Sequence, residues 1–261
     1  MLLVKDASFA YSKDSPFIFE GIDFALHPGD ILCILGPNGI GKTTLLKSIV
    51  GLNLLSNGSI HVNGKNLSHL KCNEIAKLIA YVPQTHQPVF SYSVLDVVLM
   101  GRSPHIGLFS SPSEADRIIA RESLQILGIE SLTENPYTAI SGGERQLVLL
   151  AQVLAQQAKI LLLDEPTAHL DYGNQIKILT YIKTIAAIGV IVVMTSHVPD
   201  HAFMVATQVS LMLSGEPMRI GPPEQILSKS DLCRIYGIEI DIIDDGRGGK
   251  TCIPVMPGVY N

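Results

Sequence analysis

The sequence lacks a basic excess and any apolar run long enough to cross a membrane, and both absences exclude classes of function. The 261 residues carry a net charge of −5 with a pI of about 5.9, so generic nucleic-acid binding has no electrostatic support. Mean hydropathy is high at +0.31. Even so, the longest apolar run, residues 186–194, is far shorter than the about 20 residues that span a bilayer. Residues 1–14 contain Lys5 and Asp6 and no apolar signal core, so we expect a cytoplasmic protein.

Cysteine is scarce, and its positions form no metal-binding or redox pattern. Cys33, Cys72, Cys233 and Cys252 lie far apart and include no C-x-x-C pair, so we expect reduced and mostly buried thiols. The sequence also contains no internal repeat, low-complexity tract or block of like charges. What remains is a globular chain of one or two domains, long enough to bury a large core.

Short apolar runs and helical periodicity alternate along the chain. The runs are typical of strands buried on both faces of a parallel sheet. Strands are predicted at residues 2–11, 17–26, 31–35, 59–63, 79–83, 160–163, 190–195 and 209–213, and helices at 43–50, 93–101, 114–127, 142–156 and 172–187. The pattern predicts an α/β core interrupted by a helical insert. Residues 238–261 are predicted to be a loop or a small terminal hairpin.

A glycine-rich segment, here called the phosphate loop, lies between a predicted strand and a predicted helix. It matches G-x-x-x-x-G-K-[ST] with Gly36, Pro37, Asn38, Gly39, Ile40, Gly41, Lys42 and Thr43. Its glycines let backbone N–H groups point inward at phosphate oxygens, and the helix N-terminus adds partial positive charge. We expect Lys42 to reach the β- and γ-phosphates and the Thr43 hydroxyl to ligate Mg²⁺.

The predicted strand at residues 160–163 ends in two carboxylates, Asp164 and Glu165. Taken alone, this could be a strand followed by an acidic turn. With the phosphate loop upstream, we expect Asp164 to hold Mg²⁺ through its water shell and Glu165 to polarise the attacking water as general base. The pair favours nucleotide hydrolysis over mere binding.

Residues 140–146 read Ile-Ser-Gly-Gly-Glu-Arg-Gln and begin a predicted helix. Ser141 followed by Glu144 forms a capping box, so the segment could be a well-capped helix and nothing more. Its two glycines, Gly142 and Gly143, leave the helix start bare, however, and able to meet a phosphate through backbone amides and the Ser141 hydroxyl. We expect Glu144 to fold back onto the Ser141 N–H and away from phosphate, because two anions in contact would repel.

These motifs, in this order, closely resemble those of the ABC transporter ATP-binding family. Residues 140–146 are similar to the family's signature, usually Leu-Ser-Gly-Gly-Gln. Tyr11 resembles the aromatic that stacks on adenine, Gln84 the Q-loop glutamine, residues 168–171 (Ala-His-Leu-Asp) the D-loop, and His197 the switch histidine. The resemblance covers about residues 2–230. It implies a P-loop NTPase core with an antiparallel β subdomain and a helical signature subdomain.

The resemblance also implies ATP and Mg²⁺ as cofactors and assigns roles to individual residues. Catalytic roles fall on Glu165, His197 and Gln84, and metal binding on Thr43, Gln84 and Asp164. Nucleotide binding falls on Tyr11, Gly36, Pro37, Asn38, Gly39, Ile40, Gly41, Lys42, Thr43, Thr44, Ser141, Gly142, Gly143, Glu144 and Asp171. The ATPase domain is expected to span residues 1–237, with core and β subdomain at 1–88 and 158–237 and the insert at about 89–157.

Single residues retain alternatives. Tyr11 could be an ordinary edge-strand tyrosine, Gln84 a solvated loop residue and His197 a core histidine. The histidines outside any motif are expected on the surface or in loops: His27, His61, His69, His86 and His201.

Residues 97–107 resemble the corresponding segment of importers for iron–siderophore, haem, cobalamin and some molybdate or tungstate, although Gly101–Gly107 could be just a helix end and a turn. The resemblance implies a homodimer around ATP, separate permease chains that contact residues 84–107, an indirect substrate-binding protein, and a peripheral place on the cytoplasmic face of the membrane. The alternatives are an ABC ATPase for another cargo or an exporter, and a non-transport regulator or nucleic-acid-handling ATPase.

Overall fold

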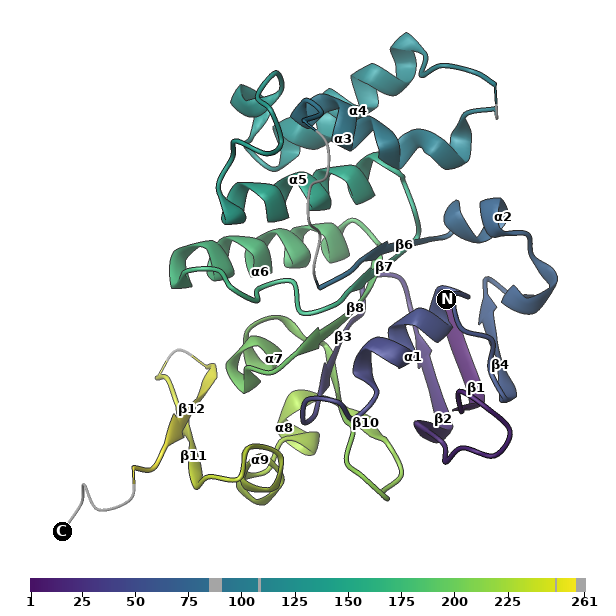
Figure 1. Cartoon of the computed structure of the whole chain (residues 1–261). Helices are drawn as coiled ribbons and strands as arrows, with labels where there is room; N and C mark the ends of the chain where they lie inside the picture. Colours follow the sequence, from purple (N-terminus) through teal and green to yellow (C-terminus); the bar gives the residue numbers. More distant parts are fainter. Residues whose placement is uncertain (85–90, 108, 247, 257–261) are drawn as a thin grey trace.

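Two β-sheets of different kinds meet across one helix, α1 (Lys42–Ile49), in the computed structural model (Figure 1). The structure describes residues 1–84, 91–107, 109–246 and 248–256. Among these, a six-stranded sheet has the order β10-β9-β3-β8-β7-β6, and a four-stranded antiparallel sheet has the order β2-β1-β4-β5.

The six-stranded sheet comprises β3 (Ile31–Leu35), β6 (Ile79–Val82), β7 (Ile160–Leu163), β8 (Ile191–Ser196), β9 (Gln208–Leu211) and β10 (Arg219–Gly221). The four-stranded sheet comprises β1 (Leu2–Phe9), β2 (Phe19–Leu26), β4 (Asn57–Val62) and β5 (Lys65–Asn66). In the larger sheet β10 runs antiparallel to β9, and the other neighbours are parallel. The α/β prediction is confirmed, and parallel strand ends meet along one edge of the larger sheet.

Both faces of the parallel strands are covered, which explains their unbroken apolar runs. On β3, Leu32 and Ile34 face α1 and the antiparallel sheet. Cys33 and Leu35 face the opposite side, where α5 (Gly142–Ala155) and α6 (Tyr172–Ala187) pack. The high mean hydropathy therefore comes from a two-sided core. In the described part of the chain, no helix combines the length and apolarity that a membrane crossing requires.

On the same side of the sheet as α6 lie α3 (Val94–Leu99), α4 (Glu114–Ile126) and α5 (Figure 1), together with the 3₁₀ helix η2 (Met100–His105) that follows α3. A Cβ on Gly101 would lie 2.1 Å from the Gln152 carbonyl oxygen, so η2 packs directly on the α5 backbone. Buried Arg102 donates to Asp116 Oδ1 at 2.9 Å and to the Ala155 carbonyl at 2.7 Å. These two residues join three helical elements.

The chain ends in a hairpin, β11 (Ile240–Asp244) and β12 (Lys250–Pro254), that packs against α7 (Pro199–Val205). Asp200 Oδ1 accepts hydrogen bonds from Thr251 Oγ1 and the Cys252 N–H, both at 2.8 Å. A terminal hairpin was one of the two predictions for residues 238–261, of which 247 and 257–261 lie outside the described residues. The remaining elements are η1 (Leu67–His69), α2 (Cys72–Ala76), η3 (Glu130–Leu132), α8 (Pro223–Ile226) and α9 (Lys229–Tyr236).

Two predictions about burial were wrong. Only Cys33 among the four thiols is buried, while Cys72 is exposed and Cys233 and Cys252 are intermediate. Cys33 lies inside a central strand, and burial raises the pKa of its thiol to about 12. His201, expected on the surface or in a loop, lies in α7 and is 3% exposed, because the helix turns it toward the core. His86 lies outside the described residues.

Candidate nucleotide site

The phosphate loop curls between β3 and α1 as its sequence predicts. Gly39 and Gly41 adopt φ values of 78° and 110°, in the left-handed region that glycine enters without strain. A Cβ on Gly36 would lie 2.5 Å from the Met212 carbonyl oxygen, so that position also requires glycine. Helix α1 begins at Lys42 without a side-chain cap, so its first N–H groups remain available to an anion.

Lys42 folds over its own loop. Its Nζ donates to the carbonyl oxygens of Gly36 at 2.7 Å and Pro37 at 3.0 Å. Burial lowers the pKa of Lys42, and the negative charges of Glu165 and Asp164 oppose this effect. The ammonium group therefore lies between the loop and the two carboxylates. Phosphate oxygens entering the loop would replace the two carbonyls as its acceptors.

The acidic pair lies where β7 ends, beside the ends of β6 and β8. Asp164 is 3% exposed, and its two oxygens accept from Thr195 Oγ1 at 2.8 Å and from the Tyr81 hydroxyl at 3.4 Å. Burial, and then the charge of Asp164, raises the pKa of Tyr81, which therefore stays a donor. Asp164 lies beneath the site as a fixed, hydrogen-bonded carboxylate.

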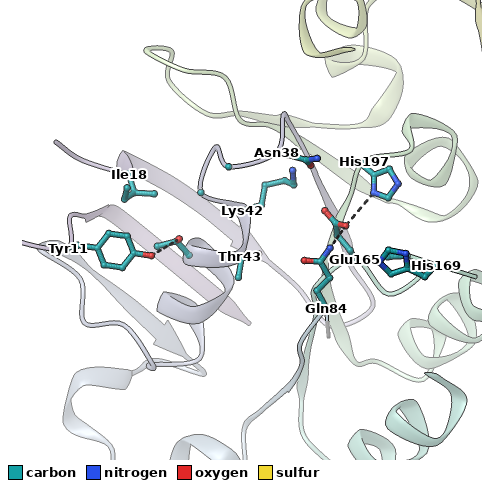
Figure 2. A pocket seen from close by; sticks show the side chains of 13 residues that line it. Tyr11, Ile18, Asn38, Lys42, Thr43, Gln84, Glu165, His169 and His197 are labelled. Atoms are coloured by element: carbon teal, nitrogen blue, oxygen red, sulfur yellow. Dashed lines mark hydrogen bonds and ion pairs between the residues drawn. The ribbon is translucent and has the colours of Figure 1, made fainter. Parts of the chain in front are cut away.

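Glu165 faces the site from the same loop, with backbone φ 49°. Its Oε2 accepts from Gln84 Nε2 at 2.8 Å and lies 3.4 Å from His197 Nδ1 (Figure 2). Gln84 follows β6 and His197 follows β8, so the strands on either side of β7 supply the two partners of the Glu165 carboxylate. All three catalytic candidates from the sequence thus meet at one point.

These groups surround a pocket of about 660 Å³. Its lining consists of Tyr11, Ile18, Asn38, Gly39, Gly41, Lys42, Thr43, Thr44, Gln84, Glu165, Ala168, His169 and His197. Tyr11 and Ile18 lie at one end and Glu165 with His197 at the other, with Lys42 and Thr43 between them (Figure 2). The volume suits a nucleotide-sized ligand, with an apolar end and a charged end.

Tyr11 is 70% exposed and lies beyond the end of β1, so its ring is not packed as an ordinary strand residue would be. Its hydroxyl is 3.4 Å from Thr44 Oγ1, and its ring meets Phe9 edge-on at a centroid distance of 5.0 Å. The exposed ring face is available to a planar group, which is what the predicted stacking role needs.

The metal-binding candidates offer oxygen donors only: the Thr43 hydroxyl, the Gln84 amide oxygen and the Asp164 carboxylate. Gln84 donates through Nε2, so its carbonyl oxygen is the atom that can bind a cation. Such a donor set fits Mg²⁺, which prefers oxygen ligands and keeps several waters.

Helix α5 begins away from the pocket, and its start forms the predicted capping box. The Ser141 N–H and Oγ donate to Glu144 Oε2 at 2.8 and 2.7 Å, and the Glu144 N–H donates to Ser141 Oγ at 3.3 Å. These bonds hold the pKa of Glu144 below its usual range. Glu144 thus turns back onto Ser141, and Ser141, Gly142, Gly143 and Glu144 are absent from the lining of this chain's pocket.

Asp171 also lies outside the pocket lining, at the start of α6. Its carboxylate accepts from the Asn174 N–H at 2.9 Å and from Asn174 Nδ2 at 2.6 Å. A Cβ on Gly143 would lie 2.7 Å from Asn174 Nδ2. The start of α5 therefore packs against the start of α6, and Asn174 joins the two.

Several residues near the site carry no sequence motif. Ile18 packs under Gly41, and Thr195 and Tyr81 hold Asp164. Buried His201, in α7, places Nδ1 3.1 Å from Ser196 Oγ and 3.4 Å from Thr167 Oγ1. It thereby connects the last residue of β8 with the loop after β7. Burial lowers the pKa of His201 to about 4. The strand order β8-β7-β6 places Thr195 and Tyr81 beside Asp164, so their residue types alone could not reveal them.

Comparison with known proteins agrees with the geometry. Residues 19–168 match the sequence model of a family described as ABC transporter. The chain is 36% identical over 236 residues to the molybdate import ATP-binding protein MolC of Haemophilus influenzae, covering 90% of this chain and 87% of that protein. It is 45% identical over 176 residues to a probable iron chelatin transport ATP-binding protein of Helicobacter pylori, covering 67% of this chain and 68% of that protein.

A solved structure described as an inward-facing conformation of a putative metal-chelate type ABC transporter shares the fold. It superposes with a TM-score of 0.86 at 32% identity, covering 98% of both chains.

Proposed function

Because the chain belongs to the ABC transporter family and is an importer-type ATPase subunit, we propose that two copies close around two ATP molecules to energise import of a metal-containing compound. One observation supports the pairing of two copies. The pocket is lined by residues of the phosphate loop and by Glu165, whereas the Ser141–Glu144 helix start lies outside it.

A single chain therefore offers two incomplete half-sites. The start of α5 has no side chains of its own at Gly142 and Gly143. Gly142 has open space where a Cβ would lie, whereas Asn174 packs beside Gly143. Such a helix start suits an anion brought by another molecule. Placing it over the γ-phosphate held by the phosphate loop of a second copy would complete both sites.

The hydrolysis step follows from the geometry at the end of β7. Glu165 is the general base, and Gln84 and His197 hold its carboxylate at the pocket wall. A water between Glu165 and the γ-phosphate would lose one proton to Glu165 as its oxygen bonds to the γ-phosphorus, and the bond from that phosphorus to the β-phosphate oxygen would break, so that ADP leaves. Lys42 and His197 would offset the growing charge on the phosphate oxygens. Mg²⁺, held by Thr43, Gln84 and Asp164, would supply charge neutralisation at the β- and γ-phosphates.

ATP binding favours the closed pair because only that state contacts the nucleotide from both sides, and hydrolysis removes the preference. Permease chains would contact the region around residues 84–107, of which 85–90 lie outside the described residues. We place the subunit on the cytoplasmic face of the membrane, bound to those chains, with a substrate-binding protein delivering cargo on the other side.

The variant Glu165→Gln tests both the role of Glu165 as base and the pairing of two copies around ATP. Hydrolysis should fall about 10²–10⁴-fold because the amide cannot take the proton. Light scattering should then show an ATP-stabilised dimer. Glu224→Gln, on an exposed residue of α8, is the matched control and should hydrolyse ATP at the wild-type rate. Full turnover by Glu165→Gln would remove Glu165 from the base role, and a monomer at saturating ATP would refute the pairing.

An experiment that identifies the class of cargo requires the partner chains. The subunit should be purified with its bound permease, placed in vesicles with the substrate-binding protein, and assayed for ATP hydrolysis with a ferric siderophore, haem, cobalamin, molybdate or tungstate. Stimulation by one of these compounds supports the proposal. Stimulation by DNA or ribosomes, or by none of the metal-containing compounds, would contradict it.

A further inference from the structure

One buried hydroxyl contacts both residues of the acidic pair. Thr195 is 0% exposed and lies in β8, whose register pairs Met194 with Leu163 of β7. The next residues along the two strands, Thr195 and Asp164, therefore lie side by side. Thr195 Oγ1 donates to Asp164 Oδ1 at 2.8 Å and accepts from the Glu165 N–H at 2.8 Å.

The bonding at this hydroxyl is directional. A threonine hydroxyl has one proton, which goes to the Asp164 carboxylate and leaves a lone pair for the Glu165 N–H. A donor that is itself hydrogen-bonded polarises its partners, and the effect is larger in a buried site. Orientation of the Asp164 carboxylate and placement of the Glu165 backbone are thus linked through a single side chain.

Glu165 needs such support because its φ of 49° is uncommon for a residue with a Cβ. This backbone turn aims the Glu165 side chain toward Gln84 and His197. The bond from its N–H to Thr195 holds that turn against relaxation to a commoner conformation. Thr195 does not line the pocket, so it acts on the reaction through its two neighbours.

We propose that Thr195 is a positioning residue for ATP hydrolysis, which sets the Asp164 carboxylate and the Glu165 backbone together. The inference rests on the proposed roles of Asp164 in holding Mg²⁺ and Glu165 as base. A purely structural threonine would affect stability alone. A positioning residue must change kcat and the Mg²⁺ dependence while leaving the rest of the nucleotide site intact.

The test compares Thr195→Val, which keeps the shape and removes the hydroxyl, with Thr195→Ser, which keeps the hydroxyl. Thr195→Val should lower kcat about tenfold to a hundredfold, the range expected for losing buried hydrogen bonds to a charged group and to a strained backbone. The KM for ATP should change less than about threefold, because Tyr11 and the phosphate loop are untouched. Thr195→Ser should restore kcat to within about threefold of wild type.

Tyr81→Phe is the matched control, because it removes the other hydrogen bond to Asp164 without touching Glu165. Mg²⁺ titrations of nucleotide binding, followed by fluorescence of a labelled ATP, give a readout besides turnover. Thr195→Val and Tyr81→Phe should both raise the Mg²⁺ concentration for half-maximal binding, but Thr195→Val should reduce kcat at saturating Mg²⁺ by a larger factor than Tyr81→Phe does. Thr195→Ala serves in place of the valine variant if that variant does not fold.

Wild-type kcat in Thr195→Val, or failure of Thr195→Ser to rescue, would overturn the inference. Equal loss of kcat in Thr195→Val and Tyr81→Phe would also overturn it, because the effect would then pass through Asp164 alone. The variant Glu165→Gln distinguishes failure of the Thr195 inference from failure of the proposed function. If Glu165→Gln is inactive while Thr195→Val has wild-type kcat, the role of Thr195 is refuted and the base role of Glu165 stands.

Discussion

Acid should destabilise this protein through one buried histidine before most carboxylates titrate. His201 is 3% exposed, and burial, with a smaller contribution from the charge of His197, lowers its pKa from 6.5 to about 4, against the opposing charge of Asp200. Above pH 6.5 the ring is neutral in both the folded and the unfolded chain, so it has no effect on stability. Between pH 6.5 and about 4 the unfolded chain binds a proton that the folded chain refuses, and the free energy of unfolding falls.

The magnitude follows from the two pKa values. At about 1.4 kcal/mol per pH unit, the interval from 6.5 to about 4 corresponds to roughly 3 kcal/mol lost by the time pH 4 is reached. That is a large part of the 5–15 kcal/mol typical of a folded domain. The loss would loosen the contacts of His201 with Ser196 and Thr167, and with them the loop that carries His197.

The assay is urea unfolding of the wild type and of His201→Gln at a series of pH values from 7.5 to 4. The glutamine keeps a polar group in the site but does not titrate, so the variant should be less stable at pH 7.5 and lose less stability as the pH falls. His69→Gln, on an exposed residue, should follow the wild type throughout. Parallel pH curves for the wild type and His201→Gln would refute the assignment of acid sensitivity to His201.

Three further changes test separate parts of the molecule. Lys42→Ala should weaken ATP binding at least about tenfold in equilibrium titrations, because a buried charge that reaches phosphate is lost, and unchanged affinity would count against the phosphate loop. Glu144→Gln should lower the free energy of unfolding by about 0.5–1 kcal/mol at pH 7 and leave turnover nearly unchanged. Because the pKa of Glu144 is depressed in the folded chain, this difference in stability should disappear as the pH falls through that pKa. A severe loss of turnover would contradict the capping role. Gly101→Ala should cost roughly 1–3 kcal/mol by forcing η2 away from the Gln152 carbonyl, and an unchanged Tm would show that the helices move apart freely.

The sequence predicted the elements that periodicity and glycine placement determine. Strands at residues 31–35 and 160–163 and the helix at 172–187 have the predicted bounds, because buried parallel strands and a capped amphipathic helix leave strong local patterns. The predicted fold-back of Glu144 is present because a capping box is a local interaction. The helices after residue 196 were not predicted, since short segments such as α7 and α8 begin at prolines and carry little periodicity.

Residues 97–107 show how packing within the chain can produce a family-like pattern. Gly101 is fixed by contact with the α5 backbone, and Arg102 by bonds to Asp116 and the Ala155 carbonyl. The contact requires glycine at position 101, and the bonds of Arg102 stabilise the insert of this chain. The presence of these two residues is evidence for the architecture of the insert, so the proposed cargo class depends on the relatives and on the transport assay.

The part of the site that sequence reasoning missed depends on strand order. Asp164 and Glu165 could be found because they follow an apolar strand. The same position on β8 is occupied by Thr195, and threonine is common in strands generally. Its function becomes visible only when β8 is placed next to β7 in parallel register, which brings its hydroxyl 2.8 Å from Asp164. The same adjacency brings Ser196 and Thr167 together through His201. Two sets of hydrogen bonds therefore join the ends of β7 and β8, one through Thr195 and one through His201. A displacement of the loop that carries His197 should change the position of Glu165 through these hydrogen bonds, and not only through shared contact with ATP.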